Sequence, residues 1–292
     1  MINFVKYRKL YYSLSVILII LSLLAIWRFG LKLGIEFTGG TLMELRFENS
    51  FSNQEIQDKL AKLNLGEVLI QPTGEKGVFL RLKEIDEATH QQILTELGSP
   101  QEMSFESIGP TIGQELEQKT GLAVVLALLA ITVYIAFAFR KVSGRVSSFQ
   151  YGLASLIALF HDVLVPIGIF AALGHFFQIE ITISFVAALL TVLGFSVHDT
   201  IVVFDRIREN LLKRSSLSFE EVVDQSLNQT LGRSINTVLT VLFTLLAIFF
   251  FGGETLKDFS LALIIGITSG AYSSIFIASP LLVSWQSWGR KV

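Results

Sequence analysis

Residues Gly194–Asn210, GFSVHDTIVVFDRIREN, decide how the rest of the chain is interpreted. This stretch begins inside an apolar run and ends in a basic segment, so it places His198 and Asp199 within a predicted membrane span. A carboxylate in the middle of a bilayer costs about 2.5–3.5 kcal/mol on insertion scales, and such residues mark ion or proton pathways with a partner elsewhere in the bundle. The stretch therefore predicts that Asp199 serves proton or ion movement.

The composition is typical of a membrane protein. Of the 292 residues, 51% are hydrophobic and 16% are charged, whereas about a quarter of the residues of a soluble domain are charged. A helix needs about 17–25 apolar residues to cross a bilayer. We predict six such spans: Tyr12–Phe29, Gly121–Phe139, Phe149–Leu173, Ile181–Phe204, Ile235–Phe251 and Phe259–Val283.

Several classes of function are excluded or disfavoured. The chain has no cysteine, which excludes disulfides, thiolate catalysis and cysteine-based metal sites. It has no Walker A sequence and no HExxH or GxSxG motif, so neither ATP use nor a standard hydrolase is indicated. A net charge of −2 gives no sign of a nucleic-acid partner. We therefore expect no enzyme, no cofactor and no metal site.

Lysine and arginine residues predict the orientation of the spans. They gather before the first span, after the second, in residues 206–233 and at the C-terminus. The alternate short loops are nearly free of them, because residues 174–180 have none and residues 252–258 have only Lys257. The positive-inside rule then predicts cytoplasmic termini and an outside location for residues 30–119. Residues 1–29 form the N-terminus and a retained first span in this scheme, and residues 120–292 the other five spans.

The outside region, residues 30–119, has the pattern of a small α+β domain. Residues 41–47, 67–71, 78–82 and 101–108 are predicted strands, and residues 52–63 and 86–97 predicted helices. The order β-α-β-β-α-β is that of the ferredoxin-like fold. His90 is expected on a solvated helix face, and nothing here suggests catalysis, so we interpret the domain as a binding or docking module.

Two glycine-bearing segments flank this domain. One contains Gly34, Gly39 and Gly40, and the other contains Gly109 and Gly113. Because glycine permits backbone conformations that other residues resist, these segments are candidate hinges between the domain and the membrane. They could equally be tight connectors.

The polar residues of the spans form a candidate proton site. Asp162 lies one turn before Pro166, which leaves the Asp162 carbonyl without its helical hydrogen bond. His198 points about 100° away from Asp199 on an ideal helix, which argues against a metal site or a Ser–His–Asp triad built on the pair. Arg233, at the start of the fifth span, is the natural countercharge for a buried aspartate. Because burial favours the neutral aspartate and a nearby arginine favours the charged form, gain and loss of that partner would release and load a proton.

Two further patterns concern packing. The last span carries small residues at four-residue spacing, namely Ala262, Gly266, Gly270 and Ser274, so this face should pack closely against a helix of this chain or of a partner. Residues 206–231 are polar with apolar residues at helical spacing, which predicts an amphipathic helix at the cytoplasmic membrane surface.

Five motifs together resemble those of a known family. They are GIEFTGG at Gly34–Gly40, GPTIG at Gly109–Gly113, FHDVLVPIG at Phe160–Gly168, GFSVHDTIVVFDRIREN at Gly194–Asn210 and GGETLKDFSLALIIG at Gly252–Gly266. With one exterior domain followed by five spans, the chain resembles the SecF type of the SecD/SecF family of bacterial protein export, in the resistance–nodulation–division superfamily. The resemblance covers nearly the whole chain.

The resemblance implies a function, a location and partners. Members of this type are accessory subunits of the Sec translocase in the inner membrane, where the proton motive force promotes polypeptide export, and their exterior domain is periplasmic. The implied partners are SecD, the SecYEG channel, YajC and preproteins driven by SecA, with lipid around the spans. Superfamily transporters have two repeated halves around a midplane site, and this chain has one half, which also implies an obligate membrane partner.

The resemblance also implies roles for residues. Asp199 aligns with the family's intramembrane aspartate and Arg233 with an arginine at the start of the fifth span. The same fourth-span motif contains Asp205, Arg206 and Arg208. Glu36 replaces a usual aspartate, and His198 replaces a usual asparagine and so adds a titratable group beside Asp199.

Other interpretations stay open at this point. One is half of a proton-driven efflux transporter of the same superfamily. Another is a membrane-embedded metal hydrolase using His161, Asp162, His198 and Asp199, and a third is a scaffold in which the buried aspartates are static anchors.

Overall fold

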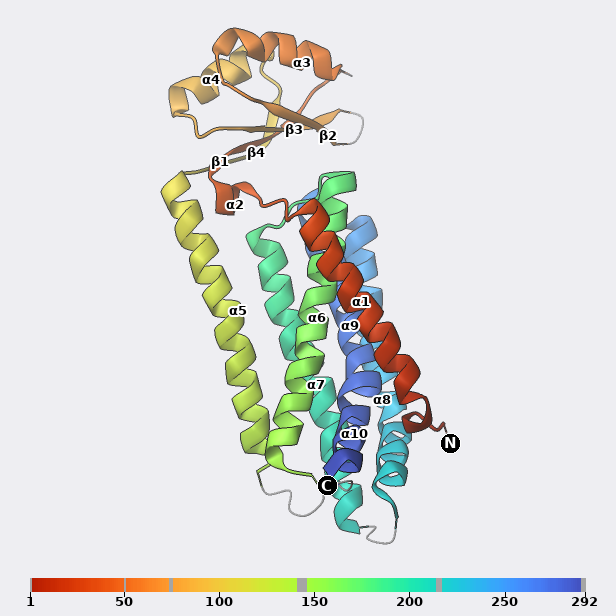
Figure 1. Ribbon diagram of the computed structural model, residues 1–292. Helices are drawn as coiled ribbons and strands as arrows, with labels where there is room; N and C mark the ends of the chain where they lie inside the picture. The colour runs from red at the N-terminus through yellow and green to blue at the C-terminus, as the bar shows by residue number, and fades with distance from the viewer. Residues whose placement is uncertain (1, 50, 74–75, 141–145, 214–216, 290–292) are drawn as a thin grey trace. The chain divides into compact units, whose positions relative to one another are not determined.

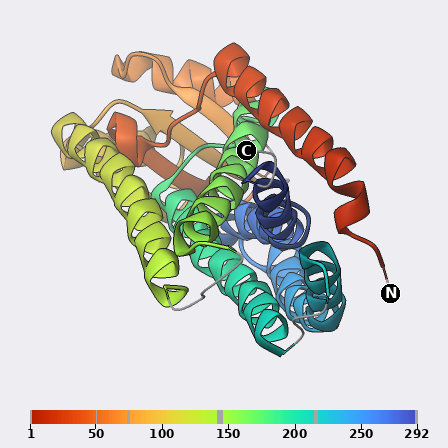
Figure 2. The ribbon, with the colours of Figure 1, turned by 60° about the horizontal axis from the view of Figure 1, so that its bottom comes forward.

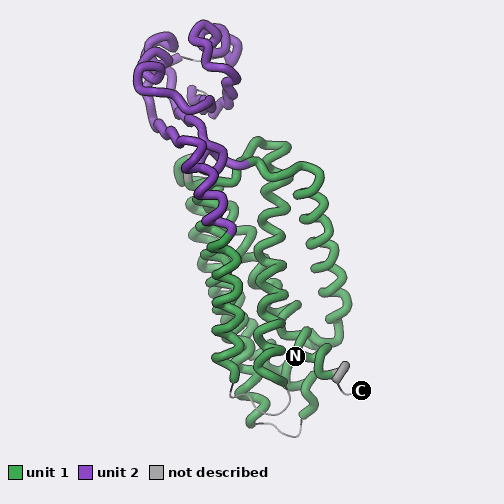
Figure 3. The backbone as a smooth tube through the Cα atoms, turned by 60° about the vertical axis from the view of Figure 1, so that its left-hand side comes forward, with its two compact units in different colours: residues 1–32, 122–292 green, residues 33–121 purple. Residues whose placement is uncertain are grey.

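The computed structural model describes residues 2–49, 51–73, 76–140, 146–213 and 217–289. The chain divides into two compact units (Figure 3). One contains Met1–Lys32 and Leu122–Val292, and the other contains Leu33–Gly121. The second unit lies close to the boundaries expected for the exterior domain, residues 30–119.

The first unit is a bundle of long helices. Within the described residues, six helices are long and apolar enough to cross a membrane. They are α1 (Arg8–Phe29, after the short turn η1, Val5–Tyr7), α5 (Pro110–Ala138), α6 (Ser148–Phe177), α7 (Ile183–Lys213), α8 (Phe219–Phe251) and a last span built from α9 (Glu254–Ser273), η3 (Ser274–Ala278) and α10 (Ser279–Gly289). Most extend beyond the predicted apolar runs, because the helical hydrogen bonding continues past the apolar residues that hydropathy detects.

Helix α9 occupies the centre of the bundle. It packs against α6, α7 and α8, and α1 packs along α6 (Figures 1 and 2). The stripe of small residues on the last span makes the contact with α7 close. A Cβ added to Gly266 would lie 2.4 Å from Cγ2 of Val192, and one added to Gly270 would lie 2.9 Å from Cβ of Ser196. The helix that this stripe contacts therefore belongs to the same chain.

The second unit is a four-stranded antiparallel sheet with two helices on one face (Figure 1). Its elements are the one-turn α2 (Ile35–Thr38), β1 (Gly40–Arg46), α3 (Asn53–Leu60) with the turn η2 (Ala61–Leu63), β2 (Leu69–Thr73), β3 (Gly77–Leu82), α4 (Glu87–Glu96) and β4 (Gln101–Ile108). The strand order β2-β3-β1-β4 and the βαββαβ sequence of elements are those of the ferredoxin-like fold, as predicted.

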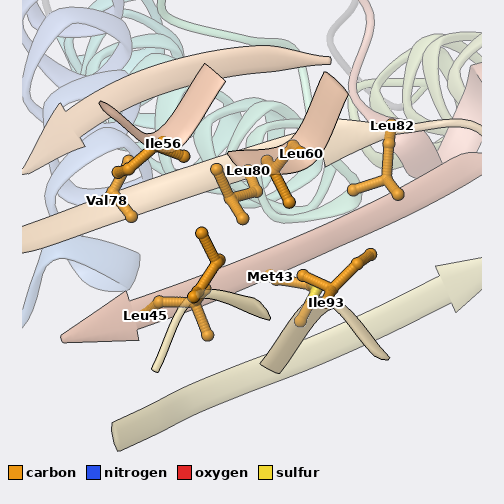
Figure 4. Close-up of a cluster of buried hydrophobic side chains, with 9 residues drawn as sticks. Met43, Leu45, Ile56, Leu60, Val78, Leu80, Leu82 and Ile93 are labelled. Atoms are coloured by element: carbon orange, nitrogen blue, oxygen red, sulfur yellow. The ribbon is translucent and has the colours of Figure 1, made fainter. Parts of the chain in front are cut away.

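Alternation along the two central strands builds the core of this domain. Met43 and Leu45 of β1 pair in register with Leu80 and Val78 of β3, and all four side chains are buried. Figure 4 shows that Ile56 and Leu60 of α3 and Ile93 of α4 close the cluster. A capping box begins α3, because Ser52 accepts from the Glu55 N–H and Glu55 accepts from the Ser52 N–H.

The prediction that His90 lies on a solvated helix face is wrong. Its side chain is buried, and its ring stacks on Phe105 of β4 with the ring centroids 4.0 Å apart. His90 Nε2 lies 2.7 Å from Oε1 of Glu102, also on β4. The histidine fills space between α4 and the sheet because a flat ring can stack on the aromatic side chain while its nitrogens keep polar partners.

The prediction of one surface helix over residues 206–231 is also wrong. Residues 206–213 are the last turns of α7, and residues 219–231 are the first turns of α8. The apolar residues of the second part are buried within the protein: Phe219, Val222, Val223 and Leu227. Helix α8 packs against α7 and η1, so the apolar stripe is covered by this chain instead of lying on lipid.

The substitution Gly168→Ala tests the contact between α6 and α1. A Cβ at Gly168 would lie 2.4 Å from the Ser22 Cα, and backbone atoms cannot move away without separating the helices. We expect a loss of about 1–3 kcal/mol in stability, measured as a lower melting temperature of the purified full chain in detergent. Gly194→Ala is the matched control, because nothing lies within 4 Å of its Cβ position. Equal melting temperatures for the two variants would contradict the close contact.

Candidate functional site

Asp162 lies at the junction of three helices and is completely buried. Its Oδ2 accepts hydrogen bonds from Ser196 Oγ on α7 and from Ser273 Oγ on α9, each at 2.6 Å. Its Oδ1 accepts from Ser269 Oγ of α9 at 3.2 Å and lies 3.0 Å from His161 Nδ1. We call Asp162, His161, Ser196, Ser269 and Ser273 the Asp162 centre.

Among the described residues, the Asp162 centre satisfies a buried carboxyl group with hydroxyl groups and without lysine or arginine. A carboxyl group buried without hydrogen-bond donors is strongly disfavoured, and donors to both oxygens offset that cost. Helix α6 continues through Pro166 and so keeps Asp162 aimed at α7 and α9. The arrangement makes Asp162 an anchor between α6, α7 and α9.

Asp199 is held in a different way. It lies on α7 with 8% of its surface exposed, and its Oδ1 accepts a hydrogen bond from Ser234 Oγ of α8 at 2.5 Å. Its Oδ2 is buried and has no hydrogen-bond partner among the described residues. A native buried oxygen without a partner requires an explanation. Protonation would remove the charge from this half-satisfied group and so lower the cost of burying it.

Arg233 does not pair with Asp199 in this structure, contrary to the expectation from the sequence. Its side chain is exposed, and no ion pair joins it to another residue in the part of the chain that the structure describes. The next residue, Ser234, contacts Asp199 instead. Adjacent helical residues point about 100° apart, so only one of the two can face α7 in a given orientation of α8.

The other charged residues of the fourth-span motif form local surface pairs. Arg208 Nη1 lies 3.4 Å from Asp205 Oδ1, and Arg206 Nη1 lies 2.8 Å from Glu209 Oε2. Such exposed pairs contribute about 0–1 kcal/mol. His198 is exposed on α7 and lies away from the buried face that carries Asp199. Neither the local pairs nor His198 contacts the two buried aspartates.

Hydroxyl groups connect the surroundings of the two aspartates. Thr200, next to Asp199, lies 2.8 Å from Ser274 through their Oγ1 and Oγ atoms. Ser274 follows Ser273 of the Asp162 centre and begins the π-helical turn η3. Single π-turns inside α-helices are frequent at functional sites.

Sequence reasoning missed the roles of Ser269, Ser273 and Ser234, although serines beside a small-residue stripe in a membrane span were a usable signal.

The two glycine segments of the exterior unit lie against each other. A Cβ on Gly39 would lie 2.8 Å from the Pro110 Cα, and one on Gly113 would lie 2.7 Å from the Phe37 carbonyl oxygen. Gly39 also has φ +73°, which favours glycine. Gly34 caps α2, and Gly40 has φ +128°. Gly109 has space, because its nearest neighbour is Glu84 at 3.5 Å from the added Cβ. Close approach of the two backbones thus accounts for Gly39 and Gly113.

No group of three or more histidine, aspartate or glutamate side chains able to hold a metal occurs among the described residues. The sets proposed for a metal hydrolase are also separated in space. His161 and Asp162 belong to the Asp162 centre, whereas His198 is exposed and Asp199 contacts α8. In the part of the chain that the structure describes, these four side chains therefore do not converge on one metal position.

Two descriptions of protein families match the chain. "Protein export membrane protein SecD/SecF, C-terminal" matches residues 89–288, and "SecD/SecF GG Motif" matches residues 24–50. The protein translocase subunit SecF of Thermobaculum terrenum is 50% identical over 303 residues, covering 98% of this chain and 95% of that protein. The subunit of the same name from Synechocystis is 37% identical, covering 97% and 94%.

A solved structure agrees with these relatives. The crystal structure of SecDF from Thermus thermophilus superposes with a TM-score of 0.85 and 33% identity over 98% of this chain. The match covers 39% of that SecDF chain, so this chain spans well under half of its length. On the family match and on identities of up to 50% over nearly full length, the chain belongs to the SecD/SecF family of protein export membrane proteins.

Proposed function

We propose that this chain is a SecF-type subunit of a bacterial protein translocase, and that it uses the proton motive force to promote export of polypeptides across the inner membrane. Membership in the SecD/SecF family and the names of its curated relatives support this function. The same names favour it over half of an efflux transporter. The single structural observation that carries the mechanism is the half-satisfied carboxylate of Asp199 between α7 and α8.

Asp199 is the residue that loads and releases the proton in this proposal. Moving one charge through 100 mV supplies about 2.3 kcal/mol, enough to shift a two-state equilibrium about fifty-fold. The neutral acid suits the present surroundings, in which Ser234 is the only hydrogen-bond donor to the carboxyl group among the described residues. Arg233 precedes Ser234 on α8, so reorientation of α8 would bring a positive charge to Asp199 and favour release of the proton.

Both chain termini lie on the cytoplasmic side in this proposal. Ile2 donates its N–H to Asn228 Oδ1 near the start of α8, at 2.9 Å, and Tyr12 Oη lies 3.0 Å from Ser284 Oγ of α10. These contacts support placing the start of α1, the start of α8 and the end of the last span at one end of the bundle. That end carries the basic residues predicted to be cytoplasmic.

The proposed assembly contains a second, SecD-type half. The 39% coverage of the SecDF chain supports this partner, because the solved relative holds much additional chain. The SecYEG channel, YajC and SecA-driven preproteins are the further proposed partners. The two halves would enclose the proton site as in two-repeat transporters.

Asp199→Asn is expected to abolish the part of export that depends on the proton gradient, because an amide cannot take up and release the proton. Export of a reporter preprotein into vesicles, with and without an uncoupler, measures that part. Glu209→Gln is the matched control on α7, since the partners of Glu209 within the described residues are the surface cations Arg206 and Lys213. Uncoupler-sensitive export at the normal rate in Asp199→Asn vesicles would remove Asp199 from the mechanism.

Ser234→Ala is expected to slow gradient-dependent export about two- to tenfold. It removes the donor to the neutral Asp199, and a hydrogen bond between neutral groups is worth about 0.5–1.5 kcal/mol. The same vesicle assay measures the effect, with Thr237→Ala as the control because Thr237 lies exposed on the same helix. Identical rates for the two variants would show that the Ser234 contact has no part in the cycle.

Purification of the full chain from native membranes in mild detergent tests the proposed assembly. We expect a second membrane subunit of the SecD type to accompany it in a stable ratio, because half of a two-repeat transporter leaves its partner surface uncovered. Mass spectrometry of the purified complex identifies the subunit. Recovery of this chain alone, at every detergent concentration that keeps it folded, would contradict an obligate partner.

A further inference from the structure

His161 is a buried titratable residue that the proposed function does not use. It lies on α6 with 1% of its surface exposed. Its Nδ1 lies 3.0 Å from Asp162 Oδ1 and 3.3 Å from Ser269 Oγ. Its Nε2 is buried and has no hydrogen-bond partner among the described residues. Nδ1 is thus held by polar contacts, whereas Nε2 can still form a hydrogen bond or bind a proton.

The donors around Asp162 indicate which form the pair adopts. The hydroxyls of Ser196 and Ser273 each lie 2.6 Å from Oδ2, and Ser269 adds a third hydroxyl 3.2 Å from Oδ1, a set of partners that suits an ionised carboxylate. An ionised carboxylate is an acceptor on both oxygens, which leaves His161 Nδ1–H as the donor of the remaining contact. The unpartnered Nε2 then carries the lone pair of a neutral imidazole.

In this form the pair of His161 and Asp162 has one net negative charge inside the bundle. Proton binding at Nε2 forms an N–H bond there and keeps the Nδ1–H contact with Asp162 unchanged. The net charge of the pair goes from minus one to zero, which lowers the cost of keeping it in a low-dielectric interior. A carboxylate that orients an imidazole also stabilises its protonated form.

We propose that His161 is a second proton-binding residue of this chain, positioned by Asp162 and separate from Asp199. Its ligand is a proton drawn from the aqueous phase, taken up on Nε2. The proposal goes beyond the function proposed above, which assigns the proton to Asp199 alone. A chain with both centres binds two protons at different helix junctions: one between α7 and α8, the other between α6, α7 and α9.

The groups that face His161 come from three helices. Helix α6 itself supplies Asp162, and α9 supplies Ser269 and Tyr272, whose ring centroid lies 5.9 Å from that of His161. The Tyr272 hydroxyl donates to the Tyr11 carbonyl of α1. Helix α7 reaches Asp162 through Ser196, and Asp199 is the titratable group one turn further along α7. Asp162 is therefore the charge in direct contact with the imidazole.

Nitrogen NMR of the ring atoms tests the proposal directly. The full chain is labelled with ¹⁵N-histidine, assembled with its unlabelled membrane partner in lipid bilayers, and measured from mildly acidic to mildly alkaline pH. We expect one histidine to change from the neutral form with its proton on Nδ1 to the doubly protonated form as the pH falls. The signal should vanish in His161→Gln and persist in His175→Gln, which removes an exposed histidine of the same helix.

Two further variants separate this inference from its alternatives. Asp162→Asn is expected to abolish the doubly protonated signal, because the neutral amide no longer compensates the imidazolium. Asp199→Asn is expected to leave the transition in place even where export is lost, so failure of the proposed function and failure of this inference give different results. A chain in which His90, His175 and His198 are all replaced by glutamine carries His161 alone and provides the assignment if His161→Gln does not assemble. A His161 signal with one unchanged protonation state at every pH would overturn the proposal.

Discussion

The enclosure of the Asp162 carboxylate determines how the centre of the bundle is built. Ser196 from α7 and Ser269 and Ser273 from α9 all donate to it, so three helices meet at one carboxyl group. Removal of these donors would leave a buried polar group without hydrogen-bond partners, which is costly. The contact needs α9 to approach α7 closely, and the small residues Gly266 and Gly270 permit that approach. The hydrogen bonds to Asp162 and the close packing of α9 against α7 therefore depend on each other.

The two buried aspartates differ in how many hydrogen bonds their carboxyl oxygens accept. We relate that difference to the anchoring of helices by Asp162 and to the proposed proton exchange at Asp199. Asp162 has donors to both oxygens, whereas Asp199 has Ser234 on one oxygen and no partner on the other among the described residues. A fully satisfied carboxylate resists change, because any movement costs several hydrogen bonds. A half-satisfied carboxylate at the contact of α7 with α8 can change its charge and its partner at smaller cost. On this basis the proposed function assigns its proton to Asp199.

Much of the fold could be predicted because it rests on local periodicity. Apolar runs predicted the six spans, and the order of predicted strands and helices over residues 41–108 predicted the ferredoxin-like domain. The wrong predictions concern side chains that pack against elements distant from them in the sequence. His90 was expected in solvent but stacks on Phe105, and the stripe starting at Phe219 was expected on lipid but is buried within the chain. The local sequence pattern shows which face of a helix is apolar, but it does not show which element packs against that face.

The sequence by itself determined that this chain is a six-span membrane protein with acidic residues in two of its spans and with the motifs of a protein-export family. Only the tertiary structure decided the partners of those acids. It paired Asp199 with Ser234 instead of Arg233, and it gathered Ser196, Ser269 and Ser273 around Asp162. The physical reason is that hydrogen bonds require donor and acceptor atoms within about 3 Å of each other. The rotation and spacing of packed helices set that distance, and neither can be obtained from the order of residues along one helix.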